Sequence, residues 1–274
     1  MKKLMQTSDT FVRQLPFSYF SLPIYLDCFG YTFERNKESL IVTQDSVYPH
    51  EFPSVFLPQK PENWSCCSVT FATQEDLQRV RQQGVPILIE RSIGSEFFYQ
   101  TEPFVYPTGS FGKKVRAFQK KYVYKLSSSC DRQTIETFHA RWLAQQKTMS
   151  QTFIEDEIFF RFCLDHLDTY PIKQVYVEID DRLVGFAWGI EHPISQCDDY
   201  IGGWVGLHLK VDYAFQGLSR FLHHERAKLF SDRPEFTLGT GVFDPGIESY
   251  KRELDPCREV GYSYMLTGDV GSSK

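Results

Sequence analysis

The sequence predicts an α/β fold with a mixed sheet of the α+β type, and three observations lead to this prediction. The chain has 274 residues, of which 24% are charged and 16% aromatic, so it can bury a sizeable core and is not disordered over most of its length. Residues 73–90 read as a helix followed by a buried strand. From residue 121 the predicted order is one strand, two helices, three strands, then helix, strand, helix and strand. We expect two units, residues 1–107 and residues 108–274.

The first unit contains one well-marked helix among short strands. Thr73 is a suitable N-cap for a helix over residues 73–84, because Glu75 and Asp76 then lie in the first turn and Gly84 follows the last. Short strands are predicted at residues 25–35, 38–44, 65–72 and 85–90.

The second unit has clearer periodicity. Helices are predicted at residues 109–122, 131–146, 154–167, 212–231 and 245–254, and strands at 122–127, 173–179, 182–191, 199–211, 236–243 and 259–266. Asp180 and Asp181 join two of the strands as a tight hairpin. Asp131 stands at the start of one helix, and Asp244 can cap the last one with Pro245 in its first turn.

The helix at residues 109–122 separates apolar from basic residues. Val115, Phe118 and Tyr122 form an apolar stripe, whereas the segment from Pro103 to Cys130 contains no acid. Its basic residues are Lys113, Lys114, Arg116, Lys120, Lys121 and Lys125. In a chain of net charge −5 this concentrated patch suits phosphate groups, although most charge runs are simply solvated faces.

Composition and spacing exclude several classes of protein. The net charge of −5 disfavours a protein that coats duplex DNA. The N-terminus lacks the apolar run of a secretory signal, and no apolar run is long enough to span a bilayer. The seven cysteines are irregularly spaced without a Cys-x-x-Cys pair, which predicts reduced thiols in a cytoplasmic protein.

The usual motifs of metal sites and serine hydrolases are missing from the sequence. His223, His224 and Glu225 do not have the His-Glu-x-x-His spacing, and no other metal-ligating cluster is present, so we expect no metal. No Gly-x-Ser-x-Gly motif occurs, which disfavours a serine hydrolase.

Three segments carry a resemblance to a known family. The order of elements resembles the GNAT (Gcn5-related N-acyltransferase) fold. "GKKVRAFQKKY" at residues 112–122 and "DPGIESYKRELDP" at 244–256 resemble the basic helix and the ending of the phosphatidylglycerol lysyltransferase C-terminal family, in which two GNAT units stand in tandem. "YLDCFGYTFERNKESLIV" at 25–42 resembles the opening of the first unit. The resemblance is piecewise and strongest from Gly112 to Pro256.

The resemblance implies an acyltransferase. The same group includes the Fem peptidyltransferases and the aminoacyl-tRNA-protein transferases, so we expect transfer of an aminoacyl group onto an amine or hydroxyl without a covalent enzyme intermediate. The acyl donor would be aminoacyl-tRNA or acyl-CoA, with no tightly bound cofactor. The tRNA acceptor arm or another phosphate-bearing substrate is the expected partner.

In the GNAT layout a central strand diverges from its neighbour and exposes backbone groups to the acyl donor. This strand corresponds to residues 199–211. Gly202, Gly203 and Gly206 would allow close approach of the donor, although they would equally suit a bulge or a tight corner.

The next helix would meet phosphates with its first backbone N–H groups. Gln216, Gly217, Ser219 and Arg220 are the candidate donors to phosphate, although Gln216 also suits a plain helix start. Ser219 and Phe221 stand where the loop of acetyl-CoA users has glycine and a small residue. These departures disfavour ordinary acetyl-CoA binding.

The last helix carries the expected catalytic groups. By resemblance, Lys251 would neutralise charge on the breaking ester, as in Fem-like enzymes, or Tyr250 would reprotonate the leaving group, as in many GNAT enzymes. Adjacent helix positions point about 100° apart, so one of the two is expected to face the cleft. His208, on the central strand, could act as a base. The alternatives are a packed Tyr250, a solvated Lys251 and a core histidine.

The leading hypothesis is therefore an aminoacyl-tRNA-dependent acyltransferase, and two rivals stay open. One is an acyl-CoA-dependent N-acyltransferase. The other is a non-catalytic module of the same fold, whose basic helix binds RNA or an anionic partner.

Overall fold

The computed structural model describes residues 17–29, 31–36, 39–44, 54–55, 64–65, 68–146, 151–192, 202–240 and 244–269. The chain divides into two compact units. The first consists of Met1–Phe97, Gly239–Glu253 and Arg258–Lys274, and the second of Phe98–Leu238 and Leu254–Cys257. Each unit is described separately.

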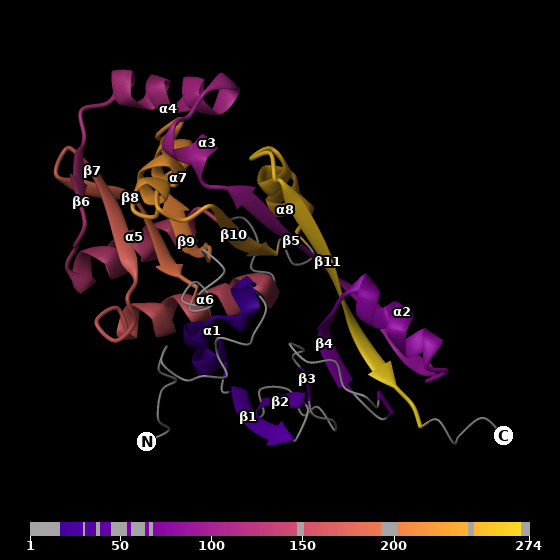
Figure 1. Ribbon diagram of the computed structural model, residues 1–274. Helices are drawn as coiled ribbons and strands as arrows, with labels where there is room; N and C mark the ends of the chain where they lie inside the picture. Colours follow the sequence, from indigo (N-terminus) through magenta and orange to yellow (C-terminus); the bar gives the residue numbers. More distant parts are fainter. Residues whose placement is uncertain are drawn as a thin grey trace. The chain divides into compact units, whose positions relative to one another are not determined.

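The first unit is a sheet with short helices (Figure 1). Its elements are a 3₁₀ turn at Tyr19–Ser21, α1 (Pro23–Cys28), β1 (Tyr31–Asn36), β2 (Ser39–Gln44), β3 (Ser54–Val55), β4 (Ser68–Ala72), α2 (Gln74–Gln82), β5 (Ile87–Gln100), α8 (Pro245–Arg252) and β11 (Arg258–Thr267). The strand order is β1-β2-β3-β4-β11-β5. Strand β11 runs antiparallel to β4, with Met265 opposite Val69. This pairing is why the division of the chain differs from the predicted boundary at residue 107: the C-terminal strand returns to the N-terminal sheet.

The core of the first unit lies between its sheet and α2. It contains Trp64, Val69, Ala72, Leu77, Val80, Val85 and Met265. Thr73 is the N-cap of α2, as predicted, and it forms a capping box: the Thr73 hydroxyl accepts from the Asp76 amide, and the Asp76 carboxylate accepts from the Thr73 amide at 2.9 Å.

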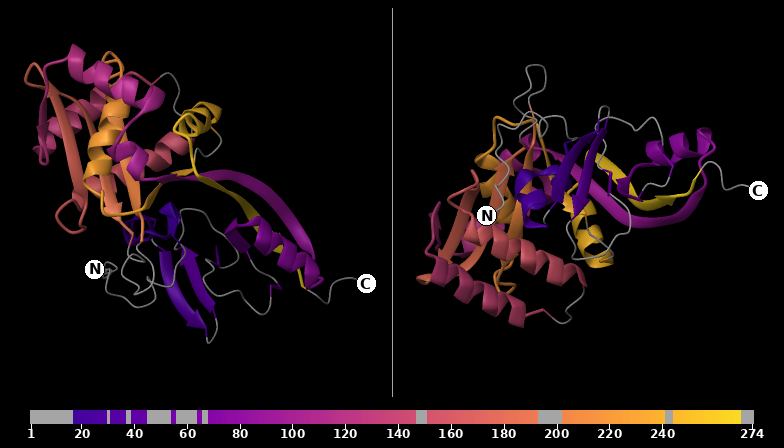
Figure 2. Two further views of the ribbon diagram at one scale, coloured as in Figure 1. Left: turned by 45° about the horizontal axis from the view of Figure 1, so that its top comes forward. Right: turned by 90° about the horizontal axis from the view of Figure 1, so that it is seen from below.

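The second unit is a mixed sheet with helices on both faces (Figure 2). Its elements are α3 (Glu102–Val105), α4 (Gly109–Lys121), β6 (Lys125–Ser127), α5 (Arg132–Ala144), α6 (Gln151–Asp165), β7 (Lys173–Ile179), β8 (Arg182–Glu191), β9 (Trp204–Val211), α7 (Leu218–Lys228) and β10 (Glu235–Thr240). The strand order is β10-β9-β8-β7-β6. Strands β6 to β9 are antiparallel, and β10 is parallel to β9.

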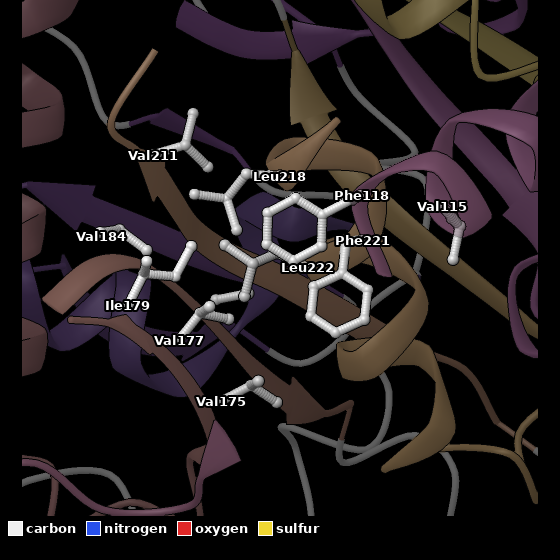
Figure 3. Packing of buried hydrophobic residues seen from close by; sticks show 11 residues of the cluster. Val115, Phe118, Val175, Val177, Ile179, Val184, Val211, Leu218, Phe221 and Leu222 are labelled. Atoms are coloured by element: carbon white, nitrogen blue, oxygen red, sulfur yellow. The ribbon is translucent and has the colours of Figure 1, made fainter. Parts of the chain in front are cut away.

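One face of this sheet packs against α7, which in turn packs against α4 (Figure 3). Valines and Ile179 from β7 meet Leu218, Phe221 and Leu222 of α7, and Phe118 of α4 stacks on Phe221 with ring centroids 4.7 Å apart. These residues follow the predicted helical stripes, so the apolar periodicity of the sequence accounts for this face of the core.

The opposite face packs against α5 and α6. Phe138 of α5 and Phe160 of α6 contact Phe186, and Phe160 also stacks on Trp188 at 5.4 Å. Because side chains alternate along a strand, Phe186 and Trp188 face these helices, whereas Gly185, just before Phe186, lies under Leu218 and Leu222 of α7.

Most predicted elements of the second unit are confirmed, and two predictions for the first unit are wrong. Residues 25–35 are not one strand: Pro23 is a favourable first residue for a helix, and α1 runs to Cys28 before β1 begins. The strand expected at 85–90 is the start of a much longer strand, β5. Exposed polar residues and Gly94, with φ of 103°, interrupt the apolar pattern, so the sequence does not indicate that this strand continues.

Candidate functional site

Strands β9 and β10 pair only briefly, as the predicted layout requires. Their parallel register contains two positions, Phe236 opposite Trp204 and Thr237 opposite Val205. From Gly206 onward β9 continues for six residues without pairing to β10. The second unit therefore contains a central strand that diverges from its parallel neighbour. Gly202 and Gly203 are buried just before this strand.

A bulge in β9 lies at the point of divergence. Ala187 of β8 is opposite Leu209, and Gly189 is opposite Gly206. Between these two pairs, β9 therefore has one residue more than β8. Because of this extra residue, side chains after the bulge point to the opposite face from the one that strict alternation along β9 would give. As a result, Trp204 lies against Phe230, whereas His208 lies against Phe159 and Phe160 of α6.

Arg226 of α7 packs against this bulge. Its side chain is fully buried, and Nη1 donates to the carbonyl oxygens of Trp188 at 3.0 Å and His208 at 3.4 Å. A Cβ on Gly206 would lie 2.6 Å from Arg226 Nη2 and 2.6 Å from Leu238. The space next to Gly206 is therefore occupied by the Arg226 guanidinium of the same chain. Whether an acyl donor also approaches here stays a prediction.

Sequence reasoning missed Arg226, although a signal was present. The residue follows Leu218 and Leu222 at i+8 and i+4, so it lies on the buried face of α7. A cation in that position predicts a guanidinium that satisfies backbone carbonyls.

His208 and Lys210 reach Asp156 of α6 from the other face of the sheet. Lys210 Nζ lies 2.6 Å from Asp156 Oδ2, and His208 Nδ1 lies 3.3 Å from Asp156 Oδ1. His208 and Lys210 are each 3% exposed, and Asp156 is half-buried. Burial would raise the pKa of Asp156, but Lys210 and His208 hold it well below its usual range. Asp156 and Lys210 were not predicted as site residues, because nothing in the sequence links a helix acid to a strand lysine 54 residues later.

The protonation state of His208 follows from this environment. Burial lowers the pKa of His208, and the nearby cations Lys210 and Arg226 act in the same direction against the carboxylate of Asp156. The imidazole is therefore neutral near pH 7. Within the part of the chain that the structure describes, its Nε2 is buried and has no hydrogen-bond partner.

A second histidine–carboxylate pair adjoins the first. His139 of α5 bonds through Nε2 to Glu157, which also accepts from Arg161 at 2.8 Å. Burial and Lys210 lower the pKa of His139 to about 4. Lys210 Nζ lies 3.8 Å from the centre of the Trp142 ring, so the cation is held between a carboxylate and an aromatic face.

The loop before α7 and the basic helix α4, predicted separately as phosphate sites, lie together. Gly217 has φ of 88°, and a Cβ there would lie 2.9 Å from the Lys114 carbonyl oxygen. Gln216 is exposed and Ser219 is partly exposed, whereas Arg220 is 5% exposed within the core side of α7. The structure thus brings the start of α7 against the N-terminal half of α4.

The basic residues of α4 are exposed. Lys113, Lys114, Arg116, Lys120 and Lys121 all lie on its solvent face, opposite the buried Val115 and Phe118. Arg116 donates to the Pro107 carbonyl at 3.3 Å, and Lys121 contacts the Tyr122 ring. Lys125, by contrast, forms an ion pair with Asp181.

The last helix belongs to the first unit. Asp244 caps α8 as predicted, accepting from the Gly246 amide at 2.8 Å and the Ile247 amide at 3.1 Å. Lys251 is 8% exposed and donates to the carbonyl oxygens of Gly239 at 3.0 Å and Thr240 at 2.6 Å. Tyr250 is partly exposed. Lys251 is therefore not a solvated surface lysine, and the catalytic roles of both residues stay predictions.

Two further features concern the described ranges of the chain: metal-ligating clusters and helices that could span a membrane. In those ranges no three histidine, cysteine or acidic residues group in a way that could hold a metal ion. No helix there combines the length and the apolar character needed to cross a membrane.

Comparison with known proteins reveals relatives by fold. A scan of protein-family models and a search of curated proteins both find no match. Among solved structures, a conserved protein of unknown function from Bacteroides thetaiotaomicron has a TM-score of 0.73 with 11% identity, over 96% of this chain and 98% of that chain. FemX has a TM-score of 0.60 with 11% identity over 96% of each chain. L-PGS from Bacillus licheniformis has a TM-score of 0.58 with 12% identity, over 97% of this chain and 93% of that one.

A tandem GNAT protein from the clavulanic acid biosynthesis pathway also matches, with a TM-score of 0.50 and 8% identity over 98% of each chain. The likeness therefore extends along almost the whole chain and not over one unit alone. The predicted fold is confirmed: the chain has a mixed α/β, GNAT-like fold of the type seen in L-PGS and FemX.

Proposed function

We propose that this protein is an acyltransferase that moves an aminoacyl group, carried as an ester on tRNA, onto an amine or hydroxyl acceptor. The observation that supports this most is the shared fold with FemX and L-PGS over almost the whole chain. The divergence of β9 from β10 gives the second unit the strand arrangement that such transferases use.

Phosphate groups of the donor would bind along α4 and the start of α7. The exposed cations of α4 are supported by the amide groups at the N-terminus of α7, which begins with Gly217 in a left-handed conformation. Gln216 and Ser219 add polar side chains at the same point. Polyanionic donors suit this surface because each neutralised phosphate releases counterions.

Each unit has its own candidate groups in this proposal. In the first unit, Lys251 or Tyr250 would assist a leaving group, and in the second unit, His208 would serve as a base. The Gly239 and Thr240 carbonyls hold Lys251 Nζ in a fixed position, and a fixed donor is the property needed next to a developing alkoxide. His208 is neutral near pH 7, which is the property needed in a base.

The acyl-CoA alternative fits the loop before α7 less well. Phe221 is completely buried and stacks on Phe118, so its bulk is part of the core between α4 and α7. A small residue, as in the loop of acetyl-CoA users, would leave a cavity there. Strong binding of acetyl-CoA would nevertheless reverse the order of the two proposals.

The donor is tested by mixing the purified protein with labelled aminoacyl-tRNAs and acyl-CoAs and a panel of amine and hydroxyl acceptors. We expect loss of label from at least one aminoacyl-tRNA and none from acyl-CoA. A protein that leaves every donor intact but retards uncharged tRNA would instead be a binding module.

A charge-reversal variant tests the phosphate surface. Lys113→Glu combined with Arg116→Glu and Lys120→Glu should weaken tRNA binding at least tenfold and lower the salt dependence by about one unit of slope per lost phosphate contact. Arg81→Glu, on the exposed face of α2, is the matched control and should bind as the unaltered protein does. Equal binding by both variants would contradict the role of α4.

A further inference from the structure

The bulge in β9 places His208 and Lys210 on the α6 side of the sheet, where Asp156 lies between them. We propose that Asp156 is a positioning residue of the transfer site: it holds the His208 proton on Nδ1, so that the Nε2 lone pair is left to take the proton of the attacking acceptor. This inference rests on the proposed function. It adds to the proposed site a residue of α6, outside the central strand.

The geometry favours a proton on His208 Nδ1. Asp156 Oδ1 lies 3.3 Å from His208 Nδ1, and Oδ2 lies 2.6 Å from Lys210 Nζ. An ionised carboxylate accepts only, so the nitrogen that faces it must carry hydrogen. A neutral imidazole has one N–H, and Nε2 is therefore the acceptor nitrogen. Lys210 keeps the carboxylate ionised and thereby keeps this tautomer in place.

His208 Nε2 and His139 Nδ1 are the two imidazole nitrogens of the described cluster that are buried without a hydrogen-bond partner, and His208 is the one on the central strand. Buried polar atoms nearly always have such a partner. The His208 ring is surrounded by Phe159, Phe160 and Trp188. The phenylalanines have no donor, and the indole N–H of Trp188 donates to the Tyr176 hydroxyl at 3.1 Å. A reacting N–H or O–H group, directly or through one water, would supply the missing donor.

The charges around His208 keep it neutral before the reaction. Asp156 approaches from α6, Lys210 from β9 and Arg226 from α7, and these three are the charged groups that act on the imidazole. Two cations and burial oppose a second proton, while the single carboxylate favours it. The imidazole is then a free base at neutral pH and gains stabilisation from Asp156 once it is protonated.

The proton balance of the step is simple. The acceptor nitrogen or oxygen forms a bond to the ester carbonyl carbon and its proton moves to His208 Nε2. When the tetrahedral intermediate collapses, the bond from carbon to the tRNA ribose oxygen breaks. That oxygen takes one proton, and the products are the acylated acceptor and a free hydroxyl, with His208 neutral again.

The neighbouring pair of His139 and Glu157 provides an internal control. Glu157, like Asp156, is a carboxylate of α6 next to a histidine. Its carboxylate bonds to Nε2 instead of Nδ1, and its histidine is on α5 instead of the central strand. Glu157→Gln should disturb the buried network comparably without touching the proposed base. A purely structural role for Asp156 would make the two variants behave alike.

The first experiment measures the tautomer and needs no substrate. In ¹⁵N NMR of the full chain labelled at histidine, His208 should show a protonated Nδ1 and an unprotonated Nε2. His208→Gln assigns the signals. In Asp156→Asn the proportion of the Nε2–H form should rise, and Asp156→Glu should restore the original pattern. An Nε2–H tautomer in the unaltered protein would overturn the inference.

The second experiment measures transfer with the donor identified above. Asp156→Asn should lower kcat at least tenfold with the KM of the donor nearly unchanged, and Asp156→Glu should recover part of the rate. The acid limb of kcat/KM should move to lower pH in Asp156→Asn, because the carboxylate that stabilises the imidazolium is gone. Unchanged kcat and pH profile in Asp156→Asn, or an equal loss in Glu157→Gln, would overturn the inference and leave the proposed function standing. An unaltered protein that is inactive with every donor would overturn both.

Discussion

The two faces of the sheet in the second unit bury different kinds of side chain. The α7 face is filled mainly by aliphatic and aromatic residues, together with Arg226, whose guanidinium binds backbone carbonyl oxygens. The α5 and α6 face buries His208, Lys210 and His139 among its aromatic rings, next to the half-buried Asp156. Buried apolar area stabilises a fold without further conditions, whereas buried charges stabilise it only when their partners are present. The first face therefore holds the unit together, and the second carries groups whose protonation can change.

The largest effect should come from the apolar face. Phe221 is fully buried between Phe118 and Tyr124, so Phe221→Ala removes an aromatic ring and leaves a cavity. The free energy of unfolding should fall by about 3–5 kcal/mol, measured by urea denaturation. Val123→Ala, at a residue that is 93% exposed, is the control and should change stability by less than about 0.5 kcal/mol. A small loss in Phe221→Ala would mean that α4 and α7 do not share a core.

The polar face should make stability depend on pH. His139 has its pKa lowered from 6.5 to about 4, so the unfolded chain takes up its proton at a higher pH than the folded chain. The stabilisation is complete above the unfolded pKa and is lost as the pH falls from about 6.5 towards 4. Between pH 7 and pH 5 the loss should be about 2 kcal/mol.

The variant His139→Phe tests this assignment. It keeps a ring in contact with Trp142 and Phe160 but has no titratable group, so its stability should change less over the same pH range. Because the lowered pKa of His208 acts in the same direction, a smaller slope should remain. An unaltered slope in His139→Phe would show that His139 is not responsible.

A smaller effect is expected at Gly206, which lies at the bulge in β9. In Gly206→Ala the new methyl group would lie 2.6 Å from Arg226 Nη2 and from Leu238, so the guanidinium must leave the Trp188 and His208 carbonyls or the strands must part. We expect a loss of about 1.5 kcal/mol. Double substitution with Arg226→Met should show strong coupling in thermal denaturation, and strict additivity would rule out this contact.

The smallest effect concerns the ion pair on the polar face. Lys210→Met leaves the Asp156 carboxylate without its ammonium partner, but Asp156 is half-buried and water can replace part of the interaction. The expected loss is about 1 kcal/mol, measured at pH 7. Because Asp156→Asn removes the uncompensated charge, the double variant should be at least as stable as Lys210→Met alone. A double variant that is clearly less stable would mean that the charge is not what destabilises Lys210→Met.

Local sequence signals predicted most of the second unit correctly. The helical stripe of Val115 and Phe118 predicts α4 and its buried side, and Asp180 and Asp181 predict the hairpin between β7 and β8. These predictions succeed because periodicity and turn chemistry depend on neighbouring residues. The first unit was predicted less well, since the long strand β5 is defined by its partner strands and not by its own alternation.

The candidate residues of each unit divide in the same way into those that the sequence indicates and those that it does not. His208 could be recognised as a polar residue on the central strand, and Lys251 as a cation on the last helix. Asp156 could not, since it meets His208 only because the bulge in β9 turns that side chain towards α6. The carbonyls that hold Lys251 are likewise brought to it by the end of β10.

By itself, the sequence determined the fold class, the order of elements in the second unit, the helix caps and the basic surface of α4, because each depends on spacing along one segment. Only the tertiary structure decided which residues share a site: the return of β11 to β4, the bulge that reverses the faces of β9, the buried Arg226 and the meeting of Asp156 with His208 and Lys210. The physical reason is that strand register and side-chain facing are set by contacts between segments far apart in the chain, and one extra residue in a strand changes every face that follows it.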